Sequence, residues 1–188
     1  MNAPDFTDIF DFWFGPPDSP ERGRPRKVWF QKSEPFDAEI HSRFRGTWER
    51  GAGGGLERWQ ATPLACLALV IVLDQFPRNM FRGTARAFSS DPAALAAAER
   101  LVARGFDRPL LPVERVFACM PFVHAEDLAA QRRSLALFET LGPEYLESAR
   151  RHHEIVARFG RFPHRNAILG RESTAEEVEF LSQPGSSF

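Results

Sequence analysis

The sequence predicts an all-α protein built of antiparallel helix pairs in a repeat-like stack, and three observations support this. Apolar residues recur at steps of three and four along most of the chain. Glycine and proline punctuate these segments, and Ser, Thr or Asp precedes several of their starts. No segment alternates like a β-strand, and the β-branched run 70–72 lies inside a longer segment that begins like a helix.

The first two helices are predicted from aromatic stripes. Phenylalanine, isoleucine and tryptophan fall on one face of residues 6–14, and Gly15 ends that helix. Residues 15–27 are rich in proline, glycine and charge and are expected to form a loop. Ser33 is a plausible N-cap for the second helix, which should end in the glycine run 51–55.

The next two helices are predicted from a shared start signal. Thr62-Pro63 places an N-cap before a proline at the first helical position, and Asp91-Pro92 repeats the pattern. The first of these helices should end at Pro77 and the second at Gly105.

Four more helices complete the prediction. A short one over 112–120 should stop at Pro121, and longer ones are expected within 125–141 and over 143–160. A capping box opens the last helix at Thr174.

Length and composition indicate one helical domain over residues 1–188, with a flexible tail over 182–188. Eighteen Phe and four Trp against one Tyr predict a thick aromatic core. A net charge of −1 lacks the basic footprint of a nucleic-acid-binding protein. The longest apolar run, 63–73, is too short to span a membrane, and no signal peptide is evident at the N-terminus, so a cytoplasmic location is expected.

Two stretches that resemble each other, DQFPRNMFRG at 74–83 and FGRFPHRNAILGR at 159–171, predict a functional site. Each Phe-Pro is expected to end one helix and begin another, which exposes backbone N–H groups beside arginine. We therefore expect the two turns to meet and to hold a phosphate or carboxylate on a small molecule or a peptide. The candidate ligand-binding residues are Asp74, Arg78, Asn79, Arg82, Arg161, Arg165 and Asn166.

The segment MPFVHAED at 120–127 supplies candidates for proton transfer. His124 and Asp127 are expected to be neighbours on one face at a helix start, where the carboxylate would orient a histidine base. His164 is a second candidate base. The alternative is that Asp127 only caps a helix.

Metal and thiol chemistry have weaker signals. His124, Asp127, His164 and one of His152 and His153 could converge, but no HxxxH or HExxH spacing occurs, and neither a metal nor a cofactor is expected. The two cysteines, which lie among apolar residues, are interpreted as small buried hydrophobic groups.

The chain resembles the bacterial family catalogued as domain of unknown function 924, from about Phe10 to Leu181. The resemblance is carried by residues 74–83, 120–127 and 158–166, followed by Leu-Gly-Arg and Ser-Thr. Val123 departs from the more polar residue expected before His124. The resemblance implies a helical fold similar to tetratricopeptide-repeat proteins and implies no activity, substrate or cofactor.

Three hypotheses for the polar residues remain open at this stage. They form an enzyme or small-molecule site for an anion, or they clamp a peptide carboxylate in a helical interaction module. In the third hypothesis, Asp74 or Asp127 pairs with the arginines in a purely structural network. The sequence leaves the substrate and the oligomeric state undetermined.

Overall fold

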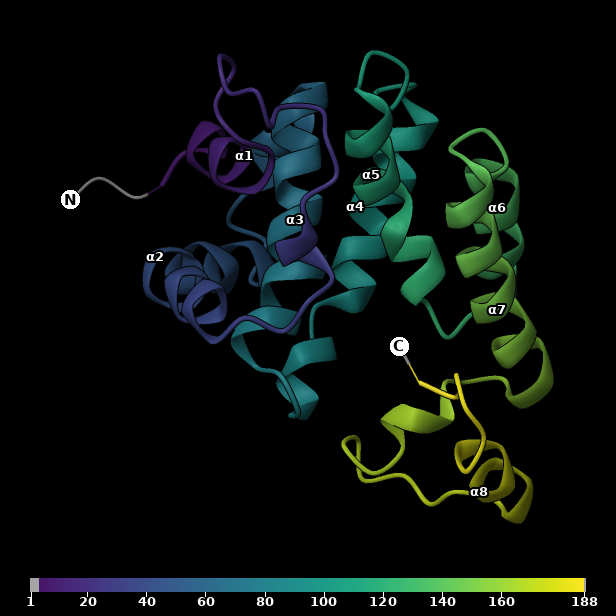
Figure 1. Ribbon diagram of the computed structural model, residues 1–188. Coiled ribbons are helices and arrows are strands. Elements are labelled where there is room, and N and C mark those ends of the chain that lie inside the picture. Colours follow the sequence, from purple (N-terminus) through teal and green to yellow (C-terminus); the bar gives the residue numbers. More distant parts are fainter. Residues whose placement is uncertain (1–3, 188) are drawn as a thin grey trace.

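The structure, a computed structural model, describes residues 4–187, and over these residues it is all-helical and contains no strand (Figure 1). The all-α prediction is confirmed. Residues 1–3 of the predicted domain and Phe188 of the predicted tail lie outside the described residues. The α-helices are α1 (Phe6–Phe14), α2 (Glu34–Ala52), α3 (Pro63–Met80), α4 (Asp91–Ala103), α5 (Pro112–His124), α6 (Leu128–Phe138), α7 (Pro143–Phe159) and α8 (Ala175–Leu181). The short 3-10 helices are η1 (Lys27–Trp29), η2 (Glu57–Ala61), η3 (Ala85–Phe88) and η4 (Pro163–Arg165).

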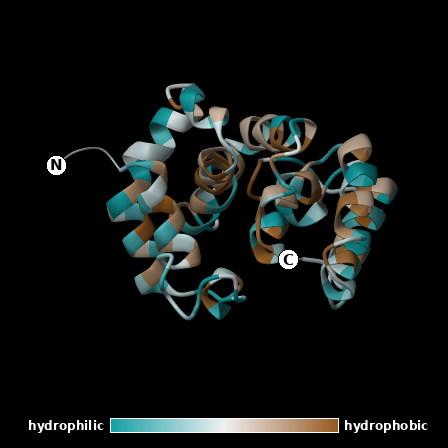
Figure 2. Cartoon of the chain, turned by 90° about the horizontal axis from the view of Figure 1, so that it is seen from above, coloured by the Kyte–Doolittle hydropathy of each residue, from teal (hydrophilic) through white to brown (hydrophobic). Residues whose placement is uncertain are grey.

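Helix α3 is the central element of the fold. Every residue from Ala65 to Pro77 is buried, as expected for a helix that is apolar on all sides. It packs against α1, α2, α4 and α5. In Figure 2 it is seen nearly end-on as a brown coil between its neighbours. Within residues 4–187, neither α3 nor any other helix is long and apolar enough to span a membrane.

The aromatic residues form the predicted thick core around α3. Trp13 is fully buried, and its ring lies 6.0 Å from that of Trp29 and 5.4 Å from that of Phe117. The indole N–H of Trp29 donates to the Trp13 carbonyl oxygen at 3.0 Å. This bond satisfies the one polar group of a buried indole and fixes the segment after the 15–27 loop against α1 and α5.

A second layer consists of α6 and α7, which pack on each other and on α5. Gln131 of α6 is fully buried, and its amide donates to the carbonyl oxygens of Val123 and Ala125 at 2.6 and 2.9 Å. These two bonds satisfy acceptors at the C-terminal end of α5 and so hold the turn that carries His124.

Several predicted helix boundaries are confirmed. Gly15 has a φ of 87° at the end of α1, and Gly160 a φ of 71° at the end of α7. Ser33 accepts from the Phe36 N–H at the start of α2, and the Thr174 capping box opens α8.

The predicted helix ends at Pro77 and Pro121 are wrong, because both prolines lie inside helices. A proline inside a helix leaves the carbonyl four residues earlier without its backbone donor. For Pro77 this carbonyl belongs to Leu73, and the Ser90 hydroxyl donates to it at 2.6 Å. Ser90 in turn accepts from the Trp48 N–H at 3.0 Å. A side chain from a distant segment thus takes over the missing bond, and α3 continues to Met80.

Candidate functional site

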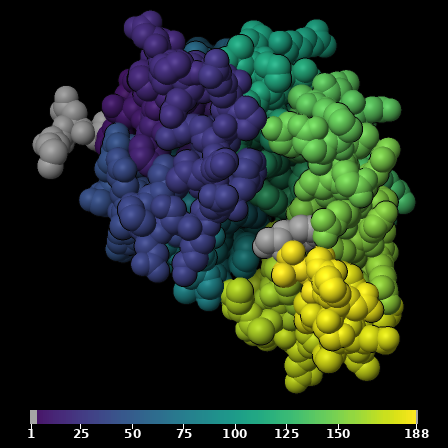
Figure 3. Space-filling view, in the orientation of Figure 1, coloured from purple at the N-terminus to yellow at the C-terminus, as the bar shows by residue number. Residues whose placement is uncertain are grey.

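A hollow of about 530 Å³ lies where α3, α5, α7 and the two segments around η3 and η4 meet. In Figure 3 the purple and blue N-terminal residues lie at the upper left of the molecule, and the yellow-green and yellow C-terminal residues lie at its lower right. Among residues 4–187, the side chains that line the hollow include three arginines and three histidines and no Asp or Glu. The lining residues are Trp29, Phe30, Gln75, Arg78, Asn79, Arg82, Gly83, Ala87, Phe88, Met120, His124, His152, His164, Arg165 and Ile168.

The two similar segments of the sequence meet at Asp91. Arg78, from the first segment, donates to both carboxylate oxygens of Asp91 at 2.8 and 2.9 Å. Arg165, from the second, reaches Asp91 Oδ2 at 3.4 Å. The two segments therefore lie close together, as predicted. They were expected to meet at two helix starts, but Pro77 lies within α3 and begins no helix.

Arg165 is buried with incomplete compensation of its charge. It is 6% exposed, and its Nε has no hydrogen-bond partner among the described residues. Its guanidinium carbon lies 4.6 Å from the ring centre of Phe88 and 4.5 Å from that of Phe162. Burial, together with the neighbouring Arg78 charge, lowers the pKa of Arg165 to about 10. The guanidinium thus lies over two aromatic rings, and the carboxylate that it reaches is already bound by Arg78.

His124 is oriented by Asp74. Its Nδ1 lies 2.8 and 3.0 Å from the two carboxylate oxygens of Asp74, so Nδ1 carries the proton and donates it. Asp74 is fully buried and also accepts from the Gln75 amide at 2.6 Å. Within residues 4–187 His124 makes no other hydrogen bond, which leaves Nε2 as a base beside the hollow.

Burial keeps the three imidazoles neutral near pH 7. It lowers the pKa of His124, and the Arg78 charge adds to this effect against the opposing effect of Asp74. It also lowers the pKa of His152 to about 3 and that of His164 to about 4. His152 Nδ1 lies 2.7 Å from the Ser148 carbonyl oxygen, to which it donates. The positive charge around the hollow therefore comes from arginine.

Asp127 does not pair with His124, and the predicted arrangement on one helical face is wrong. His124 is the last residue of α5, whereas Asp127 is the N-cap of α6 and accepts from the Ala130 N–H at 2.7 Å. The helix end that was expected at Pro121 is absent, because α5 continues to His124 before the chain turns. A histidine–carboxylate pair is present, but its carboxylate comes from α3.

The other predicted site residues have internal partners. Asn79 and Arg82 line the hollow, and both donate to the Asp37 carboxylate. The Asn79 bond is 2.7 Å long, and the two Arg82 bonds are 3.0 and 3.1 Å long. Arg161 donates to both oxygens of Glu177 at 2.7 and 2.8 Å, and Asn166 donates to the same residue at 3.2 Å. These last two residues lie outside the hollow lining and tie η4 to α8.

A second hollow of about 360 Å³ adjoins the first and shares Phe88, His124 and Arg165 with it. Its remaining lining is mostly apolar, with Asp91, Glu126 and Asp127 at its polar edge. No cluster of three or more metal-ligating side chains occurs in the described part of the chain. Burial raises the pKa of Cys66 to about 11 and that of Cys119 to about 12, so both thiols stay protonated, as expected for buried apolar groups.

Sequence reasoning missed Asp91 and Phe88. Asp91 was interpreted as a helix cap, whereas Ser90 is the N-cap and Asp91 is the first residue of α4. An Asp before a Pro looks the same in the sequence whether the Asp caps a helix or binds an arginine. Only a structure distinguishes these two roles. The aromatic residues were assigned to the core as a class, although Phe30 is 61% exposed.

Comparison with known proteins places the similarity over nearly the whole chain. Residues 9–185 match the sequence model of a family described as "Bacterial protein of unknown function (DUF924)". The solved structure of ATU0120, a protein of unknown function from Agrobacterium tumefaciens, is 45% identical with a TM-score of 0.85, covering 94% of this chain and 96% of that one. No match was found among curated proteins.

Proposed function

We propose that this chain, which belongs to the DUF924 family of bacterial proteins of unknown function, binds an anionic small molecule in the hollow between Arg78 and Arg165. The observation that carries the proposal is the incomplete hydrogen bonding of the buried Arg165 guanidinium. A buried guanidinium with an unpartnered Nε and a shared carboxylate is costly in the free protein, and an anion in the hollow would complete its hydrogen bonding.

The arrangement of charge supports an anion over a cation. The carboxylates of Asp37, Asp74 and Asp91 bind the hollow's arginines and His124, and none of the three is among the lining residues. An incoming group therefore meets guanidinium and imidazole edges first. A hollow of about 530 Å³ also falls within the ~300–1,000 Å³ typical of small-molecule sites.

We further propose that His124 moves a proton on the bound molecule. Its Nε2 would accept a proton from a hydroxyl group or a water molecule, and the resulting imidazolium would be stabilised by Asp74 through the Nδ1–H bond. His124 is then the catalytic residue and Asp74 the positioning residue. His164 lines the same hollow and is retained as a second proton carrier in the proposal.

Replacing Arg165 by Gln is expected to weaken binding of phosphate- or carboxylate-bearing ligands by about 10- to 100-fold, because a charge-assisted hydrogen bond contributes about 1.5–3 kcal/mol. The measurement is a thermal-shift screen of anionic metabolites, followed by titration calorimetry on each hit. Arg161→Ala is the matched control and should bind like the wild type, since the Arg161 guanidinium is engaged with Glu177. If no anion stabilises the wild type, or if both variants bind equally well, the proposal fails.

Asp74→Asn tests the orientation of His124. Removing the negative charge should lower the pKa of His124 further, because Asp74 raises it through both its charge and its hydrogen bond, with a smaller contribution from Asp91. Titration of the imidazole signals by NMR measures this change. A pKa that rises or stays constant would show that the carboxylate does not control His124.

A second candidate function is favoured by the aromatic mouth of the hollow. The same arginines would bind the C-terminal carboxylate of a peptide, and the exposed Phe30 would contact the neighbouring side chain. Peptides with free and with amidated C-termini separate the two functions. Binding that requires both a peptide chain and its free carboxylate favours the interaction module over the small-molecule site.

A further inference from the structure

We infer that the ligand of this site is amphipathic, an aryl or branched-alkyl phosphate or carboxylate rather than a bare anion. The inference deepens the proposed function and rests on it. Its starting point is an independent observation, the distribution of exposed apolar side chains over the described residues.

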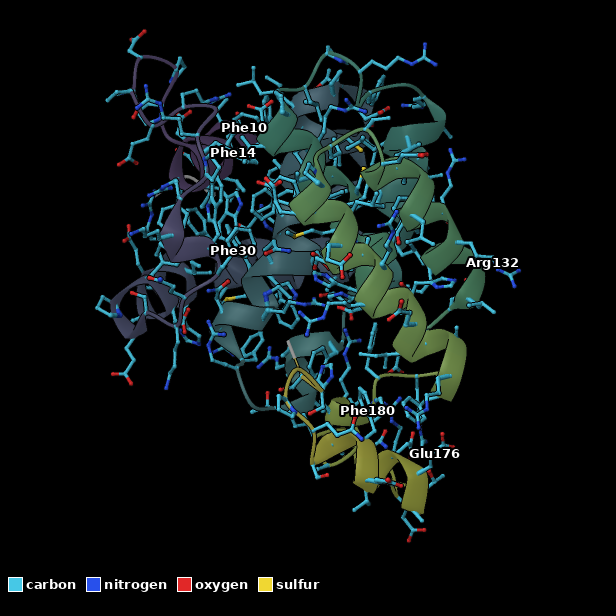
Figure 4. The ribbon with its side chains drawn as sticks, turned by 45° about the vertical axis from the view of Figure 1, so that its right-hand side comes forward. Phe10, Phe14, Phe30, Arg132, Glu176 and Phe180 are labelled. Carbon is cyan, nitrogen blue, oxygen red and sulfur yellow. The ribbon has the colours of Figure 1, made fainter. Side chains whose placement is uncertain are left out.

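Exposed apolar groups gather at the mouth of the hollow. Five large hydrophobic residues of the described chain are exposed, and two of them, Phe30 at 61% and Ile168 at 36%, line this one hollow. They come from segments far apart in the sequence, after η1 and after η4. In Figure 4 Phe30 lies between the α1 residues Phe10 and Phe14 and the C-terminal segment that carries Phe180. The hollow therefore offers exposed apolar side chains as well as arginines.

Phe30 is held in place while its outer face stays open. Its ring is nearly parallel to that of Phe117, at 11° and 6.3 Å between centres, and it meets Trp29 edge-on at the same distance. A ring fixed in this way loses little conformational freedom when a ligand packs against it. The exposed face therefore serves as a preformed apolar contact.

The interior of the hollow also combines apolar and cationic side chains. Phe88 and Met120 line it beside Arg78 and Arg165, and Phe88 lies against the Arg165 guanidinium. A bare phosphate or carboxylate would reach the arginines and leave most of the 530 Å³ and all of the apolar lining unused. An anion that carries an aromatic or branched group would fill both parts, with its charged end inward and its apolar end toward Phe30 and Ile168.

The test compares probes that share an anionic group and differ in their apolar part. Phenyl phosphate is titrated against inorganic phosphate, and benzoate against acetate, into the full chain by calorimetry. At least one aromatic probe is expected to bind about tenfold or more tighter than its bare partner, because the phenyl ring leaves water when it packs against the apolar lining. Phe30→Ala and Ile168→Ala should remove most of that preference and leave the bare anion unaffected.

Val178→Ala is the matched control, because Val178 is 58% exposed and lies on α8 outside the hollow. It should keep the wild-type preference. Equal binding of aromatic and bare probes, still lost in Arg165→Gln, would overturn the amphipathic ligand and leave the anion site standing. Failure of all four probes to bind would count against both.

Discussion

Replacing Arg165 by Met is expected to stabilise the free protein by about 1–2 kcal/mol, even though it removes a buried ion-pair partner. The lowered pKa of Arg165 means that its charge is disfavoured in the folded state, by about 3 kcal/mol for a shift from 12.5 to about 10. Contacts with Phe88 and Phe162 offset part of this cost, at about 0.5–1 kcal/mol or more each. Met keeps the aromatic packing and removes the charge.

The contrast with Arg78→Met makes this prediction specific. Arg78 binds both oxygens of Asp91 and the backbone carbonyl of Asp74, and its pKa is raised because these carboxylates outweigh its burial. Breaking a buried ion pair costs about 3–5 kcal/mol, and we expect the lower end because Arg165 still reaches Asp91 and the His124 Nδ1–H still donates to Asp74. The two arginine variants should therefore change stability in opposite directions.

Urea unfolding of the three proteins near pH 7 measures the difference, and melting temperatures should differ by about 2–4 °C for each kcal/mol. A stabilised variant that no longer binds anions would follow the common conflict between stability and binding function. If Arg165→Met is destabilised as strongly as Arg78→Met, Arg165 is part of a structural network, and the hypothesis that the polar residues only hold the fold together regains its weight.

Stability is expected to fall as the pH decreases from 7.5 to 5.0, mainly through His152. Its pKa in the folded state is about 3, below the ordinary value of 6.5, so the unfolded chain takes up a proton that the folded protein refuses. The contribution of neutral His152 to the free energy of unfolding is thus fully present above pH 6.5 and is lost progressively down to about pH 3. At pH 5.0 the loss from this one group amounts to about 2 kcal/mol. His164, with a pKa of about 4, acts in the same direction and by less, since its side chain is partly exposed.

His152→Asn keeps a donor for the Ser148 carbonyl and removes the titrating group. The variant should lose about 2 kcal/mol less than the wild type between pH 7.5 and 5.0, measured as free energies of urea unfolding at both pH values. His153→Asn, at the next position of α7, is the control for replacing a histidine on this helix. Asp74 does not interfere, because its pKa is held below the ordinary value of about 3.8 and its contribution is lost only at lower pH. Parallel losses in wild type and His152→Asn would show that His152 is not buried in its neutral form.

Local rules predicted most of the helices, and they failed at Pro77 and Pro121, which both lie inside helices. Residues 6–14, the Ser33 cap, the Gly160 stop and the Thr174 capping box depend on neighbours in sequence, so pattern alone located them. At Pro77 the outcome depended on the Ser90 hydroxyl, which the fold brings to the Leu73 carbonyl from another segment. A backbone rule cannot anticipate a side-chain donor that arrives through tertiary packing.

The candidate site was also only partly predictable from the sequence. The sequence by itself determined an all-helical chain with an aromatic core, and it identified arginine and histidine residues in two similar segments as the polar groups that core packing does not need. Only the tertiary structure decided how they combine: Asp74 rather than Asp127 orients His124, Asp91 joins the two segments, and Glu177 engages Arg161 away from the hollow. The physical reason is that an ion pair depends on distances of a few ångströms between side chains. Those distances are set by how helices pack, and residue spacing along the chain does not contain them.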